Sequence, residues 1–565
     1  MVLLEKYFDV AFAAPNGVKK LRELILSLAM QGKLVAQDPH DTPASELLKE
    51  IEAEKNRLVK DGKIKQSKPL PEIKPDEVPY DLPKSWEWVR LGEIVSLLGD
   101  GIHGTPNYDD SGEYFFINGN NLSDGTIEIK ENTKKIAADE YLKYKKELNA
   151  RTVLVSINGT IGNVAFYDDE KVILGKSACY FNLFDTIDKQ FTRRLLNSKY
   201  FLEYTFASAT GSTIKNVSLR SMREFSFPLP PLAEQSRIVA KIDELMARCD
   251  ELEKLRGNLN QKQITVHNAA LNRLLTAKDQ SDFNTAWQFI TRHFGDLYSV
   301  KENVAELRKA ILQLAVMGKL VPQDPIDRPA SELLKEIEKE KTRLLKERKI
   351  KNTKKLPDID DFQIPFEIPD NWRWTILGQL CFQVSDGPHY SPNYVSNENG
   401  VLFLSTRNIK TDRFDLSNVK YISQEDHTLF CQRVKPELGD ILYTKGGTTG
   451  IAKVNDLEFE FSVWVHVAVL KISKKLLFPQ YIALALNSPV CFEQSQAYTQ
   501  GISNFDLGLT RMIKILLPLP PLAEQHRIVA KCDQLMTLCD NLEKQIDETN
   551  SKKTNLLNAV MTKFW

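Results

Sequence analysis

One fourteen-residue phrase occurs twice in this chain, and that repeat constrains the fold more than any other feature. PLPPLAEQSRIVAK spans residues 228–241, and PLPPLAEQHRIVAK spans residues 518–531. When both copies are extended to 27 residues they are identical at 21 positions, with a constant offset of 290. Because an internal repeat reveals the architecture before any local pattern does, we interpret the chain as a duplication.

A second repeated segment supports this interpretation. Residues 21–58 and 307–344 are identical at 28 of 38 positions, with an offset of 286. Between the repeated segments lie residues 86–227 and 372–517, named here the first and second variable domains. They agree only at short anchors, which are WEWVRLG against WRWTILG, DGIHGTPNY against DGPHYSPNY, and NGTIG against GGTTG. Each half therefore consists of an arm, a variable domain and a repeated phrase.

The repeated phrase predicts the start of a long helix. Pro230 and Pro231 set the backbone for a first helical turn, and Glu234 follows where the helix dipole favours negative charge. Apolar residues then recur at alternating spacings of four and three, which is a heptad seam that needs a partner helix. The seam residues are Ile238, Ile242, Leu245, Cys249 and Leu252 in the first copy, and Ile528, Cys532, Leu535, Cys539, Leu542 and Ile546 in the second.

Two matching seams in one chain can pair with each other, and this predicts two antiparallel helices, each about 65 Å long. The chain ends favour the same topology, because Trp565 corresponds to Leu275 and Phe8 corresponds to Phe294. Joining the two ends would nearly close a ring of two units. We therefore expect an internal pseudo-two-fold arrangement with the variable domains at opposite ends.

Composition restricts the class of protein only broadly. A chain of 565 residues is too long for one core, and its 75 basic and 75 acidic side chains neither favour nor exclude a polyanionic partner. No stretch approaches the twenty apolar residues of a membrane span, so we expect a cytoplasmic protein. The cysteines disfavour a disulfide framework and a zinc site, since they are odd in number and never spaced as CxxC. They are Cys179, Cys249, Cys381, Cys431, Cys491, Cys532 and Cys539.

A symmetric scaffold that carries two different domains can bind two different features of one elongated ligand. Duplex DNA is the obvious ligand of that kind. For any single loop residue a turn role is the more ordinary interpretation, so only clusters carry the prediction. Arg407 is the best single candidate for a base contact, because arginine pairs with guanine. The first variable domain offers His103, Thr105, Asn107, Tyr108, Asn118, Asn120, Asn121, Asn158, Thr160, Ser212, Thr213, Lys215 and Asn216. The second offers His389, Tyr390, Tyr394, Thr406, Arg407, Asn408, Lys445, Thr448, Thr449, Ser503 and Asn504.

The second arm is locally basic, with ten basic and four acidic residues over 335–355. The pattern indicates an exposed helix followed by a basic loop, and a solvated face is favoured over a phosphate clamp. Asp358, Asp360 and Asp361 are interpreted as an acidic turn rather than a metal site.

The duplicated phrase PLPPLAEQxRIVAKxDxLMxxCDxLE, alternating with two divergent domains, resembles the specificity subunit of type I restriction-modification enzymes. The arm motif LxLAxxGKLVxQDPxDxPASELLKxIE resembles the long-armed members of that family. The resemblance implies an α+β fold, with two globular mixed α/β target recognition domains joined by two long antiparallel, coiled-coil-like helices. The corresponding segments are an N-terminal helical arm (1–85), target recognition domain 1 (86–227), a central conserved region (228–371), target recognition domain 2 (372–517) and a C-terminal conserved helix (518–565).

The same resemblance implies how such a subunit works. The two target recognition domains read the halves of an asymmetric bipartite DNA site, while the conserved helices set the spacer and dock two DNA-adenine methyltransferase subunits. Those partners use S-adenosylmethionine, and the restriction/translocase subunits use ATP and Mg. The chain itself is expected to bind no cofactor and no metal.

The sequence lacks the motifs of several enzyme classes, which favours a non-catalytic subunit. We find no GxxxxGK[ST] or HExxH pattern and no NPPY or DPPY motif. The glycines around DGIHG match GxGxxG at residues 99–104, but they lack the strand-loop-helix setting that a phosphate-binding loop needs. Two alternatives stay open at this point. One is a self-contained nuclease or methyltransferase, and the other is a scaffold whose variable domains bind two proteins.

Overall fold

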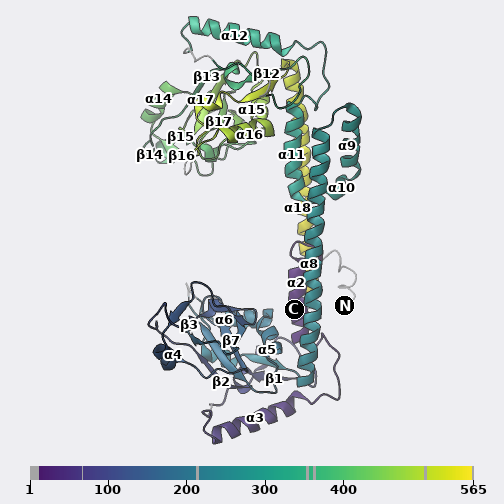
Figure 1. The fold of residues 1–565 in the computed structure, drawn as a ribbon, viewed down its shortest axis with the longest axis vertical. Coiled ribbons are helices and arrows are strands. Elements are labelled where there is room, and N and C mark those ends of the chain that lie inside the picture. The colour runs from purple at the N-terminus through teal and green to yellow at the C-terminus, as the bar shows by residue number, and fades with distance from the viewer. Residues whose placement is uncertain are drawn as a thin grey trace. The chain divides into compact units, whose positions relative to one another are not determined.

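The computed structural model describes residues 12–66, 68–211, 215–350, 356–360, 364–501 and 505–562. The chain divides into two compact units, one made of Met1–Asn258 with Thr549–Trp565 and the other of Leu259–Glu548. Both predicted long helices exist, as α8 (Leu232–Leu275) and α18 (Leu522–Met561), labelled in Figure 1. Each unit therefore combines an arm and a variable domain with parts of both long helices. Several residues named above lie outside the described part of the chain, namely Phe8, Ser212, Thr213, the loop 351–355, Asp361, Ser503, Asn504 and Trp565.

The first variable domain is built on a four-stranded antiparallel sheet in the order β2-β10-β7-β8. Strands β7 and β10 are buried at every position, so both faces of this sheet are covered. A second sheet, β6-β3-β9, pairs β3 with β9 in parallel. The strands are β2 (Val95–Asp100), β3 (Tyr114–Ile117), β6 (Lys134–Ile136), β7 (Thr152–Ser156), β8 (Val164–Phe166), β9 (Val172–Leu174) and β10 (Ala178–Leu183), with the short pair β4 (Leu122–Ser123) and β5 (Thr126–Ile127). The helices are α4 (Ala138–Tyr144), α5 (Lys189–Leu196), α6 (Lys199–Ser208) and α7 (Leu219–Glu224).

The second variable domain has the same design despite its different sequence. Its main sheet has the order β13-β20-β17-β18, and its second sheet, β14-β16-β15-β19, again contains one parallel pair. The strands are β13 (Cys381–Asp386), β14 (Tyr394–Val395), β15 (Val401–Leu404), β16 (Lys420–Ile422), β17 (Ile441–Thr444), β18 (Ala452–Val454), β19 (Phe461–Val463) and β20 (Val467–Ile472). The helices are α13 (Leu377–Leu380), α14 (Gln424–Arg433), α15 (Pro479–Leu486), α16 (Pro489–Tyr498) and α17 (Leu509–Met512). The predicted mixed α/β fold is confirmed for both domains.

The first two residues of each repeated phrase are the end of a β-strand, and the long helix begins four residues after the start of the phrase, at Leu232 and Leu522. Strand β1 (Glu87–Arg90) pairs with β11 (Ser226–Leu229) so that Trp88 lies opposite Pro228. Strand β12 (Arg373–Ile376) pairs with β21 (Leu516–Leu519) in the same register. Each pair has only two strands, so a proline is tolerated there. The WEWVRLG and WRWTILG anchors are therefore held by the strand that leads into each long helix.

The glutamate near the start of each long helix also holds other parts of the chain together. Glu234 and Glu524 are fully buried. Glu234 Oε2 accepts a hydrogen bond from Trp86 Nε1 at 2.9 Å, and Glu524 Oε2 accepts one from Trp372 Nε1 at 2.9 Å. Their other carboxylate oxygens accept hydrogen bonds from arm glutamines, Gln37 and Gln323. Each glutamate thus ties an arm, a variable domain and a helix start together, and burial raises its pKa.

The heptad seam packs against an arm helix. In one unit Ile238, Ile242 and Cys249 share a core with the arm helix α2 (Gly17–Met30). In the other unit Ile528, Cys532 and Cys539 share a core with the arm helix α11 (Lys301–Val316). Within each unit the seam therefore packs against an arm helix, and the pairing of the two seams with each other stays a prediction. Leu252 was also assigned to the seam but is 39% exposed, whereas Leu245, Leu535, Leu542 and Ile546 are half-buried.

Ion pairs fix the direction of the arm helices. Arg22 Nη2 lies 2.6 Å from Asp250 Oδ1, and Arg308 Nη2 lies 2.7 Å from Asp540 Oδ1. Arg256 donates to the carbonyl oxygen of Phe12, so α2 runs antiparallel to α8. These contacts repeat between the halves, so each arm helix docks on its long helix by the same arginine.

The direction of the long helices can be derived inside the second unit. Lys301 pairs with Asp547 and Arg308 with Asp540, so α11 is antiparallel to α18. His267 bonds to Tyr298 and Lys319 donates to the carbonyl oxygen of Leu275, so the end of α8 runs parallel to α11. The two long helices are therefore antiparallel in this unit, as predicted.

The remaining helices of the connection and arms are α3 (Ala44–Lys60), α9 (Gln280–Arg292), α10 (Phe294–Leu297) and α12 (Ala330–Lys346). Among the described residues, no helix is long and apolar enough to cross a membrane.

Candidate nucleic-acid interface

Loops that are distant in the sequence meet at one edge of the first variable domain. The first two predicted clusters, 103–108 and 118–121, are joined through the segment 174–177. Ile102 N–H donates to the carbonyl oxygen of Leu174 at 2.8 Å, and Gly175 N–H donates to that of Ile117 at 2.8 Å. The Ser177 hydroxyl donates to Asn118 Oδ1 at 2.9 Å. These bonds hold the two clusters side by side.

The third and fourth clusters join the same edge. Ile157 N–H donates to the carbonyl oxygen of Ser177 at 2.9 Å, and Val217 N–H donates to that of Ile157 at 2.8 Å. The Asn158 side chain donates to Asn216 Oδ1 at 3.2 Å. The structure therefore brings together the described residues of all four predicted clusters.

The second variable domain gathers its loops in the same way. Trp464 N–H donates to the carbonyl oxygen of Leu404 and Lys445 N–H to that of His466, at 2.9 and 2.8 Å. Gly447 N–H donates to the carbonyl oxygen of Phe505 at 2.9 Å. The bridge between Gly446 and Asp506 corresponds to the bridge between Asn158 and Asn216. The two domains thus present equivalent loop edges.

The NGTIG and GGTTG anchors form one tight turn in both domains. Gly159 and Gly447, the second residues of the anchors, have φ of 74° and 70°. Gly162 and Gly450, the fifth residues, have φ of 94° and 91°. Side chains other than glycine rarely adopt these values, which explains why both glycines recur. The turns leave the predicted Thr160 and Thr448 exposed.

Most of the described candidates lie at the surface. Asn107 is partly engaged, since its side chain donates to Glu140 Oε1 at 3.4 Å. The exposed candidates are His103, Thr105, Asn107, Tyr108, Asn120, Thr160, Lys215, His389, Tyr390, Tyr394, Arg407 and Thr448. Half-buried candidates are Asn118, Asn158, Asn216 and Thr406.

Four candidates are buried, and the structure contradicts direct base contact by them. Asn121 and Asn408 occupy equivalent positions, where Oδ1 accepts a hydrogen bond from the backbone N–H of Asn118 or Ser405 at 3.0 and 2.9 Å. Thr449 Oγ1 accepts a hydrogen bond from Gln496 at 3.2 Å. The fourth, Lys445, is 4% exposed. Polar side chains of this kind stabilise turns, and that use competes with ligand binding.

Lys445 and Asp386 form a buried ion pair in the second variable domain, and the half-exposed Arg433 and Asp506 extend it into an ion network. Lys445 Nζ lies 3.3 Å from Asp386 Oδ2 and 3.3 Å from Asp506 Oδ1. Arg433 also pairs with Asp386, which is 2% exposed. Burial opposes ionisation of Asp386, but the hydrogen bond from Arg433 and the charge of Lys445 outweigh it, so the pKa of Asp386 is lowered. The equivalent of Lys445 in the first domain is the buried Ile157.

Some features of the interface are the same in both domains. His103 Nε2 lies 2.8 Å from Asp100 Oδ2, and His389 Nε2 lies 3.2 Å from Asp386 Oδ2. A lysine also lies over Tyr108 and over the equivalent Tyr394. Lys134 Nζ is 5.7 Å from the ring centre of Tyr108, and Lys420 Nζ is 4.0 Å from that of Tyr394.

Sequence reasoning missed both of these lysines and Arg433. Lys134 and Lys420 follow their tyrosines by 26 residues and reach them only through strand pairing. One signal could have found them, because they are equivalent at the offset of 286 that also relates the DGIHGTPNY and DGPHYSPNY anchors. Arg433 carries no such signal, since it reaches Asp386 from the end of α14.

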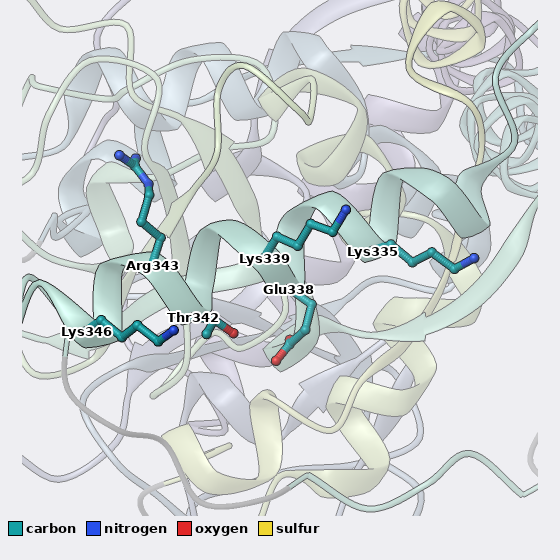
Figure 2. Close-up of a pocket in the computed structure, with 6 residues that line it drawn as sticks. All are labelled: Lys335, Glu338, Lys339, Thr342, Arg343 and Lys346. Atoms are coloured by element: carbon teal, nitrogen blue, oxygen red, sulfur yellow. The ribbon is translucent and has the colours of Figure 1, made fainter.

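The basic arm contains the predicted helix, α12. A shallow hollow of about 510 Å³ lies along one face of it, lined by Lys335, Glu338, Lys339, Thr342, Arg343 and Lys346. Figure 2 shows these side chains spread along the helix without converging on one point. Arg343 is also engaged by Glu340 and Glu347. The geometry agrees with the solvated face that was favoured for this segment.

Comparison with known proteins matches both halves of the chain. The family model described as "Type I restriction modification DNA specificity domain" matches residues 83–261 and 369–549, which is more than half of the chain. Each match contains one variable domain and the repeated phrase that follows it.

Similarity to individual proteins extends over nearly the full length. The chain is 34% identical over 576 residues to the type I restriction enzyme EcoEI specificity subunit of Escherichia coli, covering 96% of this chain and 93% of the relative. It is 33% identical over 564 residues to the EcoAI specificity subunit of Escherichia coli, with the same coverage. Among solved structures, the HsdS subunit from Thermoanaerobacter tengcongensis is similar at 18% identity with a TM-score of 0.39, covering 85% of this chain and 98% of that chain.

Proposed function

The chain belongs to the family of type I restriction-modification DNA specificity subunits, and from that premise we propose that its two target recognition domains read the two halves of one asymmetric bipartite site. The observation that carries the proposal is the pair of equivalent loop edges with different side chains. Asn120 and Arg407 are exposed at the same position of the two edges. Such different side chains select different bases, because amides suit adenine and guanidinium suits guanine.

The proposal also assigns the long helices a docking role for two methyltransferase subunits. It is supported by identical residues exposed at the same positions of α8 and α18, such as Ala240 with Ala530 and Asp243 with Asp533. Two equivalent surfaces suit two copies of one partner. In this assignment the chain carries no catalysis of its own, and S-adenosylmethionine, ATP and Mg belong to the partner subunits.

Mapping of adenine methylation in cells with and without this gene tests the proposal. The expected result is one bipartite motif that is methylated only when the gene is present. Exchanging residues 372–517 for those of another specificity subunit should change one half of the motif and leave the other half unchanged. An unaltered methylation pattern after deletion or exchange would contradict the assignment.

Arg407→Ala is expected to relax one base position of a single half-site. A bidentate arginine–guanine contact discriminates by about 1–3 kcal/mol, so the variant should accept other bases at that position. The measurement is methylation of a duplex library in which each position is varied singly. Asn120→Ala is the matched variant and should act on the other half-site, while a uniform loss at all positions would contradict a base contact.

A further inference from the structure

One exposed pair of side chains recurs in both target recognition domains, although other residues of the loop edges differ. Tyr108 and Tyr394 occupy equivalent positions and are 46% and 43% exposed. Their rings lie 6.2 and 6.4 Å from those of Phe116 and Phe403, which are also equivalent. Lys134 and Lys420 complete the pairs, as described above.

Strand pairing fixes the position of each lysine relative to its tyrosine. Tyr394 lies opposite Ile422 in the β14–β16 pair, two residues from Lys420. In the first domain Asp109 N–H donates to the carbonyl oxygen of Lys135 at 2.9 Å, which places the neighbouring Tyr108 and Lys134 together. The pair is therefore preorganised by the backbone.

Both ammonium groups can still bind an anion. Lys134 and Lys420 are exposed, and neither forms an ion pair with a carboxylate in the described part of the chain. An ammonium group over a tyrosine face keeps N–H donors toward solvent, and the exposed phenol adds an O–H donor. Together they form a small site for an oxyanion.

Other exposed residues of the two loop edges differ between the domains. Gly104 is replaced by Tyr390, Asn120 by Arg407 and Lys215 by Phe505 at equivalent positions. Two half-sites of different sequence have only the sugar–phosphate backbone in common. A feature kept in both domains cannot distinguish the half-sites, so it fits the backbone, whereas the residues that differ fit the bases.

We propose that the Tyr108–Lys134 and Tyr394–Lys420 pairs each bind one backbone phosphate of duplex DNA and position their domain on it independently of sequence. This inference rests on the proposed function. It assigns two separate roles: the Tyr–Lys pairs position each domain on the DNA backbone, and residues such as Asn120 and Arg407 contact bases.

The salt dependence of duplex DNA binding by the full chain tests whether the Tyr–Lys pairs contact phosphates. Each phosphate contact contributes about 0.9 to the slope of log K against log salt. Lys134→Ala and Lys420→Ala should each lower the slope by about 0.9, so the weakening relative to the unsubstituted chain should be about 3-fold greater at 50 mM than at 200 mM salt. The weakening should be equal for a duplex that carries the methylated motif and for a scrambled duplex.

Three further variants make the outcome specific. Lys49→Ala removes an exposed charge from α3, where Lys49 is paired with Glu46, and should leave the slope unchanged. Lys134→Arg and Lys420→Arg should retain the slope, because arginine also binds phosphate. An unchanged slope in the alanine variants, or weakening confined to the motif duplex, would overturn the phosphate assignment. Equal binding of motif and scrambled duplexes by the unsubstituted chain would instead count against the proposed function.

Discussion

Lys445→Ile is expected to destabilise the second target recognition domain by about 3 kcal/mol, because it removes one partner of a buried ion network. Asp386 is 2% exposed and would keep Arg433 and His389 but lose the ammonium group 3.3 Å away. Arg433 is about half exposed, so it compensates the buried carboxylate only in part, and removing the buried partner costs more than the pair contributes. Isoleucine is the residue of the first domain at this position, so it suits a buried site by size and polarity.

The effect should also reach DNA recognition. Lys445 connects the segment that carries His389 to the segment that carries Asp506, through its contacts with Asp386 and Asp506. Loss of these contacts frees the loop edge of the second domain only. The second domain should therefore discriminate less between bases in its half-site, while specificity for the other half-site is unchanged.

Hydrogen exchange of strands β13, β17 and β20 measures the change in stability, because a chain with two units does not unfold in a single step. Lys435→Ala is the control, since Lys435 is 51% exposed in its pair with Glu460 and such surface pairs contribute about 0–1 kcal/mol. If Lys445→Ile exchanged as slowly as the unsubstituted chain, the network would have no role in stability.

The ion network also predicts how the second domain responds to acid. The pKa of Asp386 is lowered below its ordinary value, so its ionised form is favoured by folding. The corresponding stability is present above the ordinary pKa of about 3.9 and is lost as pH falls through the lower folded value. Acid unfolding of the second domain should therefore begin at a higher pH in Lys445→Ile, because one of the groups that lower this pKa is missing.

The repeat predicted the two long helices and the two variable domains, the family resemblance implied that these domains are mixed α/β, and residue types suggested the loop clusters. The repeat could not predict the partner of each seam, because a heptad pattern specifies that a helix packs and not which helix it meets. Arg22 and Arg308 decide that choice by pairing with Asp250 and Asp540, each more than 220 residues away. Contacts of such long range leave no local pattern.

The candidate site shows the same limit at the level of side chains. Residue type suggested Asn121 and Asn408 as readily as Asn120, although the first two cap turns and Asn120 faces solvent. A one-residue shift along a turn reverses which side chain is buried. Lys134 and Lys420 were missed because tertiary strand pairing brings them to the site, and comparison of the two halves is what reveals them.

The contact between α8 and the segment that begins the second arm is polar, whereas the equivalent contact in the other unit is apolar. This contact is called the joint. His267 Nε2 and the Tyr298 hydroxyl are 3.1 Å apart, and both side chains are buried. The equivalent positions in the other unit hold Leu557 and Phe12, which lie in one apolar cluster. The same joint is thus built in two chemically different ways.

His267→Leu is expected to destabilise the second unit by about 2 kcal/mol, because it leaves the buried Tyr298 hydroxyl without its partner. His267→Leu with Tyr298→Phe reproduces the apolar pair of the other unit. The double variant should recover most of the loss, since replacing both partners by apolar groups of similar shape is nearly neutral. Hydrogen exchange in α11 measures both changes, and an additive loss in the double variant would show that the two side chains do not act as a pair.

The pH dependence distinguishes this joint from simple packing. Burial lowers the pKa of His267, so folding favours the neutral ring. A lowered histidine pKa means that the unfolded chain takes up the proton first, and stability falls as pH drops below the ordinary value of about 6.5. The unsubstituted second unit should therefore loosen as pH falls below about 6.5, whereas His267→Leu, which has no ring to protonate, should lose this part of the dependence. An identical pH profile in both proteins would place the titrating group elsewhere and leave the joint's stability to packing alone.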